Sequence, residues 1–484
     1  MNRSPIVAIL GHVDHGKTTL LDTIRDSRLV SKEHGGITQR IGGYEIATGI
    51  KGYDIEKITF IDTPGHEAFS KLRSRGTNVA DIAILVIDAT DSVKPQTVES
   101  IAHIKNAKIP FIVAMNKMDV VGANPDKVKK DLLKHEVITE DMGGSIVALP
   151  ISAIKKQGIQ ELLESILIIA SDIDLKYDLK NPSKSYIIET KKDQRGVVVS
   201  CVIKDGTLRV GDIAHTNQEK IKIRALINDM GKSVKEVVPS TPFEILGFSK
   251  SPEVGSLMTS EHQDLSEAPE KDQEPRSQMN VSSMLQKEGE EKQKKLTVII
   301  KADSQGTLEA ILASLSKNEN IEIVLSSIGG VHRSDIFLAK TTKSIVIGFS
   351  VSVDNEVKTL AKQEKVIIKT YDIIYELLDE LEEVSDLISE KEEKEKNLKA
   401  QVKILATFPI EGDIVFGGLV TKGKLNVGDT AEVYRKDKLI GKSKLTSLKN
   451  RAKSVQEVKK DQECGMLFTP ALDIKVRDVI KFVL

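Results

Sequence analysis

The chain is poor in cysteine, with only Cys201 and Cys464 among its 484 residues. The two lie far apart and without metal-ligand spacing, which argues against a disulfide framework and favours a reducing compartment. No apolar run reaches the roughly 18 residues of a membrane span. The N-terminus, MNRSP, has no signal-peptide apolar stretch. We therefore expect a cytoplasmic protein, or one of an organelle stroma or matrix, with no membrane association.

The chain also lacks an excess of charge of either sign. Its 70 Lys+Arg and 71 Asp+Glu leave a net charge of −1. Any nucleic-acid binding must therefore come from a local basic patch, because there is no global positive field. At 53.2 kDa the chain is too long for a single hydrophobic core, and its length predicts roughly three or four domains.

A phosphate-binding motif opens the chain. An apolar strand pattern, IVAIL, is followed by GHVDHGKT and then by a helical apolar pattern. This matches GxxxxGK[ST], in which backbone N–H groups surround the phosphates, Lys17 reaches the outer ones and the Thr18 hydroxyl coordinates magnesium. A plain glycine turn between a strand and a helix is the alternative. We assign nucleotide binding to Gly11, His12, Val13, Asp14, His15, Gly16, Lys17, Thr18 and Thr19.

Two further stretches favour a nucleotide-dependent switch over an ordinary surface turn. The strand ITFID is followed by TPG, so that Asp62 can hold magnesium through water and the Gly65 N–H can reach the last phosphate. In GGITQ, Thr38 can complete the magnesium shell and sense the outermost phosphate. We add Asp62, Thr63, Pro64 and Gly65 to the nucleotide site, and assign Thr18, Thr38 and, through water, Asp62 to the metal.

The base is predicted from NKMD, which ends a third apolar strand. Asp119 can accept hydrogen bonds from guanine N1–H and the exocyclic amine, whereas adenine presents no such donor edge. A base that leaves this buried carboxylate unpaired can be rejected by a factor of about 10⁴ relative to guanine. We therefore predict GTP and Mg²⁺ as ligands, with a base pocket formed by Asn116, Lys117, Asp119, Ser152 and Ala153.

Past residue 175 the pattern changes to short β-branched runs broken by glycines. GTLRVGD begins at Gly206, and a related GKLNVGD begins 217 residues later, at Gly423. We interpret these as two small antiparallel barrels. We predict a multidomain α/β plus β protein with these parts: 1–175, P-loop GTPase domain; 176–260, β-barrel; 261–295, linker; 296–384, α/β/α domain; 385–400, long connecting helix; 401–484, C-terminal β-barrel.

The motifs GHVDHGKTT, GGIT, DTPGH and NKMD together resemble those of the translational GTPases. In that family the histidine after DTPG moves toward the attacking water, so the resemblance implies a catalytic role for His66. An imidazole can orient water and stabilise developing charge there. An ordinary surface histidine is the alternative.

The resemblance narrows to the family of bacterial-type translation initiation factor two, through STPFEILGF, IIKADSQGTLEA, YDIIYELLDE and ECG. It implies GTP-dependent recruitment of formylmethionyl initiator tRNA to the small ribosomal subunit and promotion of subunit joining. It also implies hydrolysis triggered by the large subunit, with other initiation factors as partners. The sequence begins five residues before its first strand, and we expect the protein to lack the family's usual N-terminal extension. We expect a monomer.

In this family the last barrel holds the acyl end of the initiator tRNA. The resemblance places Glu463, Cys464 and Gly465 in that pocket and carries over Lys449. The family's following basic and aromatic residues are replaced by Asn450, Arg451 and Ala452. Residues 401–484 carry 16 Lys+Arg against 10 Asp+Glu, which suits contact with tRNA phosphates. A basic solvated face is the alternative.

Two other classes of protein compete with this interpretation. A nucleotide-sensing assembly protein would bind GTP without using its hydrolysis, and the complete motif set weighs against it. A tRNA-delivering elongation factor would place its barrels consecutively, whereas here an α/β/α domain and a helix separate them. Ribosome-stimulated phosphate release discriminates the first of these classes from a hydrolysing initiation factor.

Overall fold

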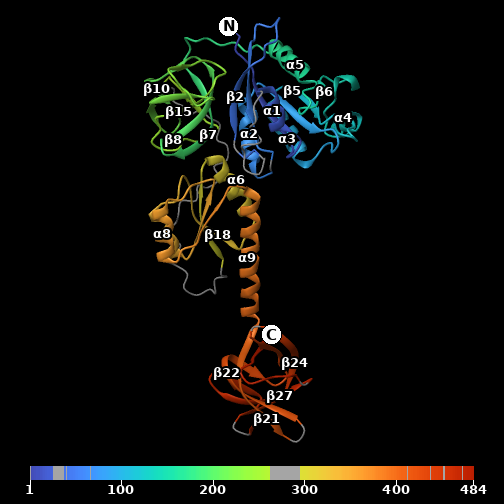
Figure 1. Cartoon of the computed structure of the whole chain (residues 1–484), viewed down its shortest axis with the longest axis vertical. Helices are drawn as coiled ribbons and strands as arrows, with labels where there is room; N and C mark the ends of the chain where they lie inside the picture. Colours follow the sequence, from blue (N-terminus) through green and yellow to red (C-terminus); the bar gives the residue numbers. More distant parts are fainter. Residues whose placement is uncertain are drawn as a thin grey trace. The chain divides into compact units, whose positions relative to one another are not determined.

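The computed structural model divides the chain into two compact units, Met1–Gln286 with Thr297–Leu381, and Lys287–Leu296 with Glu382–Leu484 (Figure 1). It describes residues 2–25, 38–39, 41–65, 67–261, 295–410, 413–436, 438–450, 453–470 and 472–483. The predicted linker 261–295 therefore lies almost entirely outside the described residues. Among the described helices, none is both long and apolar enough to cross a membrane.

The N-terminal part is a six-stranded sheet in the order β2-β3-β1-β4-β5-β6. All neighbours are parallel except the β2–β3 pair, which is antiparallel. The carboxyl ends of the parallel strands meet at one edge, where ligands bind in open α/β sheets. The strands are β1 (Ile6–Gly11), β2 (Gly42–Ala47), β3 (Lys57–Asp62), β4 (Ile82–Asp88), β5 (Phe111–Asn116) and β6 (Ala148–Pro150).

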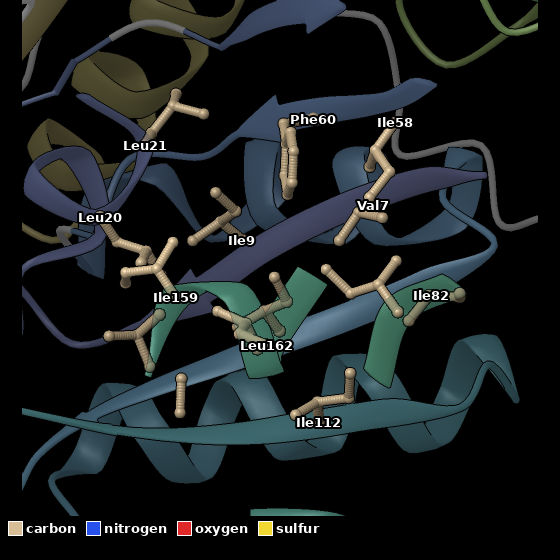
Figure 2. Close-up of a cluster of buried hydrophobic side chains, with 14 of the residues drawn as sticks. Val7, Ile9, Leu20, Leu21, Ile58, Phe60, Ile82, Ile112, Ile159 and Leu162 are labelled. Atoms are coloured by element: carbon tan, nitrogen blue, oxygen red, sulfur yellow. The ribbon is translucent and has the colours of Figure 1, made fainter. Parts of the chain in front are cut away.

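Helices cover this sheet because its central strands are apolar on both sides. Figure 2 shows side chains of β1, β3, β4 and β5 meeting those of α1 and α5. Every residue of β1 and β4 is buried, as expected for strands covered on both faces. The helices are α1 (Lys17–Arg25), η3 (Glu67–Phe69), α2 (Ser70–Val79), α3 (Pro95–Ala107), α4 (Pro125–Leu133), η4 (Glu140–Met142) and α5 (Ile159–Asp172).

The next part is antiparallel and follows the predicted β pattern. Its main sheet runs β11-β10-β16-β7-β8-β15-β12-β13, and a separate pair joins β14 to β9. One apolar core lies within it. The strands are β7 (Lys184–Asp193), β8 (Gly196–Asp205), β9 (Leu208–Arg209), β10 (Ile213–His215), β11 (Lys220–Lys222), β12 (Ala225–Asn228), β13 (Ser233–Val234), β14 (Glu236–Val237), β15 (Pro242–Leu246) and β16 (Leu257–Thr259).

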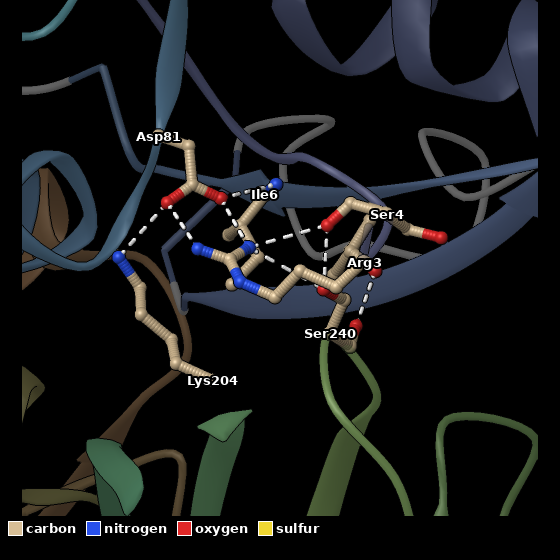
Figure 3. Close-up of polar contacts among 7 residues, drawn as sticks. Arg3, Ser4, Ile6, Asp81, Lys204 and Ser240 are labelled. Carbon is tan, nitrogen blue, oxygen red and sulfur yellow. Dashed lines mark hydrogen bonds and ion pairs between the residues drawn. The ribbon is translucent and has the colours of Figure 1, made fainter. Parts of the chain in front are cut away.

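A buried ion cluster joins this first barrel to the N-terminal parallel sheet (Figure 3). The Arg3 guanidinium donates to both carboxylate oxygens of Asp81, at 2.6 and 2.7 Å. Lys204, at the end of β8, adds a hydrogen bond of 3.0 Å to the same carboxylate. The Ser240 hydroxyl donates to the Ser4 carbonyl. Two cations share one buried anion, so the carboxylate is needed to hold these elements together.

The third part of the first unit is a four-stranded sheet in the order β18-β17-β19-β20, with helices packed on it. Ser304 is the N-cap of its first helix and accepts a hydrogen bond from the Thr307 N–H, so the KADSQG loop is structural. The elements are β17 (Leu296–Ala302), α6 (Gln305–Leu315), β18 (Ile321–Ile328), α7 (Arg333–Thr342), β19 (Ile345–Phe349), α8 (Asn355–Glu364) and β20 (Ile368–Tyr371).

Helix α9 spans Ile374–Lys396, so its first turns fall in the predicted 296–384 domain and its later turns in the predicted connecting helix 385–400. Its first turns are apolar on one side, and Ile374, Leu377 and Leu381 are buried. The last barrel begins at Leu398 instead of the predicted residue 401, since Leu398 already pairs with Val483.

The second unit contains a closed barrel. Its strands pair in the order β21-β28-β23-β24-β27-β22, and β22 returns to pair with β21. One apolar core fills the interior. The structure thus confirms the predicted fold class. The strands are β21 (Leu398–Ile410), β22 (Asp413–Asn426), β23 (Thr430–Arg435), β24 (Lys438–Asn450), β25 (Lys453–Ser454), β26 (Glu457–Lys459), β27 (Glu463–Thr469) and β28 (Val479–Val483).

Candidate nucleotide-binding site

The phosphate loop leaves β1 at Gly11 and enters α1 at Lys17. Gly11 has a φ of +142°, and a Cβ there would lie 2.3 Å from the Val86 carbonyl oxygen. Only glycine fits this close approach of two strands. The Val13 N–H donates to the side-chain oxygen of Gln96 at 3.1 Å, so a residue of α3 holds the middle of the loop.

Lys17 is buried with its ammonium inside the loop. Its Nζ donates to the His12 carbonyl at 2.6 Å. Burial lowers the pKa of Lys17 to about 8, against the opposing effect of the Asp62 carboxylate. A Cβ on Gly65 would lie only 2.4 Å from Nζ, so the DTPG turn closes directly over the ammonium. This arrangement leaves a positive charge where the outer phosphates of a nucleotide would be neutralised.

The two histidines of the loop contribute backbone and packing, not charge. Their rings meet edge to face, with centroids 5.0 Å apart. Burial lowers the pKa of His15 to about 4, and burial also lowers the pKa of His12. Both rings are therefore neutral near pH 7, and Lys17 is the cation of the loop.

The two threonines assigned to magnesium lie together. The hydroxyls of Thr18 and Thr38 are 2.5 Å apart, and Asp62 is buried at the end of β3. Hydroxyl and carboxylate oxygens are the ligands that Mg²⁺ prefers, with water and phosphate oxygens completing its shell. The donor set therefore fits Mg²⁺ bound together with a nucleotide. Among the described residues, no cluster of three or more His, Cys, Asp or Glu side chains could hold a metal ion by itself.

Asn116 links the phosphate loop to the loop that carries Ser152 and Ala153, which we name the base loop. Its Nδ2 donates to the His15 carbonyl at 3.0 Å, and its Oδ1 accepts from the Ala153 N–H at 3.0 Å. A Cβ on Gly16 would lie 2.4 Å from the same amide nitrogen. The Asn116 side chain thus fixes both loops, which come from sequence positions more than a hundred residues apart.

The other three residues of the predicted base pocket, Lys117, Asp119 and Ser152, also have side-chain partners. The Ser152 hydroxyl donates to the Asp119 carboxylate at 2.6 Å, and this hydrogen bond lowers the pKa of Asp119. Asp119 is therefore ionised and acceptor-only near pH 7, as guanine recognition requires. Lys117 forms an ion pair of 2.7 Å with Asp88 at the end of β4. The sequence motifs did not indicate Asp88 or Gln96, because neither lies in a recognised pattern.

The DTPG turn is held by a buried arginine that the sequence analysis also missed. Arg73 of α2 is fully buried; it donates to the Pro64 carbonyl at 3.0 Å and to Glu99 at 2.7 Å. Although burial opposes ionisation, hydrogen bonds from His103, Ser70 and Arg73 lower the pKa of Glu99 to about 2. The Thr63 hydroxyl donates to the Ile9 carbonyl. His66 lies outside the described residues, and its catalytic role stays a prediction.

In the C-terminal barrel, β27 lies between β22 and β24, where Gly465 faces both Gly417 and Lys449. Glu463 and Lys449 are exposed, whereas Cys464 points into the barrel core, with Sγ 3.6 Å from the Gly418 carbonyl. Burial raises the pKa of Cys464 to about 12. Side chains alternate along a strand, so the three residues of ECG cannot all face one ligand.

Comparison with known families agrees with this geometry. The profile of "Elongation factor Tu GTP binding domain" matches residues 2–171. The profile of "Elongation factor G domain 2" matches residues 182–261, and that of "Translation-initiation factor 2" matches residues 270–382. The three matched ranges correspond to the parallel sheet, the first barrel and the region of the four-stranded sheet.

Relatives match over almost the whole chain. Translation initiation factor IF-2 of Halothermothrix orenii is 41% identical, covering 99% of this chain and 71% of that protein. The factor of Clostridium novyi is 39% identical, covering 99% and 72%. The crystal structure of GDP-bound aIF5B from Aeropyrum pernix overlays with a TM-score of 0.48 at 27% identity, over 100% of this chain and 92% of that one.

Some relatives are much longer than this chain. It spans half the length of IF-2 from Desulforamulus reducens, which is 39% identical over 99% of this chain. Identity at this level, over nearly every described element, and the assembled phosphate and base loops lead to one conclusion. The chain belongs to the translation initiation factor IF-2 family and carries a translational-GTPase domain.

Proposed function

We propose that this protein binds GTP with Mg²⁺, recruits formylmethionyl initiator tRNA to the small ribosomal subunit and promotes joining of the large subunit, which triggers hydrolysis. The observation that carries the proposal is the double hydrogen bond of Asn116, which brings the phosphate loop and the base loop into one site. Its partners are the two ribosomal subunits, the initiator tRNA and other initiation factors. It acts as a monomer in the cytoplasm or in an organelle stroma or matrix.

In this proposal the residues of the site have separate roles. Lys17 binds the outer phosphates, and Asp119, ionised and held by Ser152, accepts from the guanine edge. Thr18 and Thr38 would ligate Mg²⁺ and Asp62 would hold it through water; when bound, the ion would supply neutralisation of charge on the phosphates. Arg73 positions the DTPG turn through the Pro64 carbonyl, and His66 orients the attacking water.

The C-terminal barrel is proposed to bind the acyl end of the tRNA. The outward-facing surface of β27 presents Glu463 and Gly465 beside the exposed Lys449. Cys464 shapes this surface only from the inside, because its thiol is in the core. A pocket of this kind discriminates a neutral formamide from a free ammonium through the free energy of desolvating the charge. Lysines contribute through counterion release from tRNA phosphates.

The test uses residues 382–484, which form a closed barrel with its own core. Filter binding compares formylmethionyl, unformylated and uncharged initiator tRNA at several salt concentrations. We expect the formylated form to bind most tightly, with affinity falling as salt rises. Lys449→Ala should weaken binding of all three forms. The control is Lys424→Ala, since Lys424 is already paired with Glu457. Equal binding of all three tRNAs by the wild-type barrel would remove the acyl pocket from the proposal.

A further inference from the structure

Gln39 directly follows the magnesium-site residue Thr38, and its side chain contacts the start of α9. Its Nε2 donates to the Asp372 carbonyl at 2.8 Å, and its Oε1 accepts from the Ile374 N–H at 3.1 Å. A side-chain amide is suited to this contact because it carries both donors and an acceptor. Both ends of the amide are used.

The first N–H group of α9 uses an acceptor from a distant segment of the chain. The first N–H groups of a helix have no partner within the helix. Ser, Thr, Asp or Asn usually supplies the oxygen from the preceding position, but the residue before α9 is Ile373. Gln39 supplies it instead, from a segment 335 residues away along the chain.

The same short segment holds Thr38 beside the phosphate loop. The Thr38 and Thr18 hydroxyls are 2.5 Å apart. Hydroxyl oxygens are of the kind that would ligate Mg²⁺. The hydrogen bonds of Gln39 therefore fix the residue next to one that would hold the metal.

The phosphate loop acts electrostatically on the first turn of α9. Burial raises the pKa of Tyr375, and the Asp14 carboxylate of the loop raises it further. These contacts all lie within the first compact unit.

We propose that Gln39 is a positioning residue, which anchors Thr38 to the first turn of α9 and so contributes to discrimination between GTP and GDP. The proposal rests on the nucleotide site proposed above. Only GTP has the outermost phosphate that, with Mg²⁺, engages a switch threonine. Holding Thr38 in place should therefore favour GTP. Because coupling is reciprocal, GTP should in turn stabilise the first turn of α9.

The experiment uses the full chain and measures affinity for a non-hydrolysable GTP analogue and for GDP, each with Mg²⁺. Gln39→Met keeps the size of the side chain and removes both hydrogen bonds, whereas Gln39→Glu keeps only the acceptor. We expect Gln39→Met to weaken the GTP analogue about fivefold to tenfold, as two modest hydrogen bonds allow, and to leave GDP nearly unchanged. Gln39→Glu should retain part of the preference for the GTP analogue over GDP. Gln363→Met, on the exposed side of α8, is the matched control.

Hydrogen exchange gives a second measurement. Amides of Ile374 to Glu376 should exchange more slowly with the GTP analogue than with GDP in the wild type, and this difference should disappear in Gln39→Met. An unchanged GTP-to-GDP affinity ratio in Gln39→Met overturns the inference and leaves the nucleotide site intact. Absence of magnesium-dependent GTP binding by the wild type overturns the nucleotide site as well. Normal GDP binding by Gln39→Met shows that the variant is folded.

Discussion

The Glu189 carboxylate of β7 accepts a hydrogen bond from the Gly306 N–H at the start of α6, at 3.1 Å. The Ser304 hydroxyl donates to the same carboxylate at 3.2 Å. The adjoining α2 reaches α6 through an ion pair of 2.7 Å between Arg75 and Glu309. A carboxyl group of the first barrel thus accepts hydrogen bonds at the start of a helix of the α/β/α domain, where the first N–H groups have no partner within the helix.

This junction predicts a pH-dependent stability. Burial raises the pKa of Glu189 from 4.5 to about 7, although hydrogen bonds from Thr190, Gly306 and Ser304 and the charge of Arg75 oppose the shift. The protonated form is favoured in the folded state, so its stabilising contribution is complete below pH 4.5 and is lost as pH rises through 7. The shift corresponds to about 3 kcal/mol.

The variant Glu189→Gln tests this, because a neutral amide of the same shape does not titrate. Between pH 6 and 8.5 the wild-type melting temperature should fall more steeply than that of Glu189→Gln, and the variant should be the more stable at pH 8.5. Calorimetry of the full chain measures both. Parallel melting curves at every pH would show that Glu189 does not titrate in this range.

Removing Asp81 should destabilise the contact between the GTPase sheet and the first barrel. Asp81→Ala leaves the cations of Arg3 and Lys204 without their shared anion, in a site where Arg3 and Asp81 are only 8% and 7% exposed. Breaking a buried pair costs about 3–5 kcal/mol. The control Asp174→Ala removes an exposed partner of Lys176 and should change stability by less than about 1 kcal/mol. Denaturant unfolding of Asp81→Ala and Asp174→Ala measures the difference. Equal unfolding midpoints of the two variants would contradict the role of the ion cluster around Asp81.

Asp119→Asn should shift base preference from guanine toward xanthine, because an amide donates where the carboxylate accepts. The ionised carboxylate, held by Ser152, is the group that this substitution changes. Competition binding with GTP and xanthosine triphosphate measures the change. Unchanged GTP affinity with no gain for xanthosine triphosphate would place Asp119 outside the base pocket.

Nucleotide binding should take up a proton at alkaline pH. The buried Lys17 has its pKa lowered to about 8 in the nucleotide-free protein, and phosphate groups would raise it. Affinity should be nearly constant below about pH 7 and fall as pH rises past 8, by about fourfold at pH 8.5. Titration calorimetry at pH 8.5 in two buffers of different ionisation enthalpy measures the uptake. No proton uptake would mean that Lys17 keeps its charge state on binding.

His66→Ala should leave GTP binding nearly intact and reduce ribosome-stimulated hydrolysis by about 10² or more, since orientation of a nucleophile is commonly worth that factor. The expectation rests on the position of His66 directly after DTPG. Phosphate release with purified ribosomal subunits is the measurement, and GTP affinity is the control. Wild-type turnover in the variant would make His66 an ordinary surface residue.

Local pattern was sufficient to predict the fold class, whereas the assignment of the nucleotide site stays a prediction. The phosphate loop, DTPG and NKMD each follow a strand, and parallel strands bring their carboxyl ends to one edge whatever the rest of the chain does. The related sequences GTLRVGD and GKLNVGD similarly predicted two barrels, because alternation of side chains with period two and glycine turns are local properties of the sequence. Strand alternation was also enough, in principle, to exclude Cys464 from the outer face that carries Glu463 and Gly465.

Only the tertiary structure showed which distant residues complete these local elements. The first N–H groups of α6 and α9 are satisfied by Glu189 and Gln39, and nothing in the local sequence of either helix identifies a partner hundreds of positions away. In the sequence, Arg73 and Asp81 resemble ordinary charged surface residues, but both are buried in the folded protein. A hydrogen bond or ion pair depends on separation in space, whereas a motif records separation along the chain, and folding decides the first without changing the second.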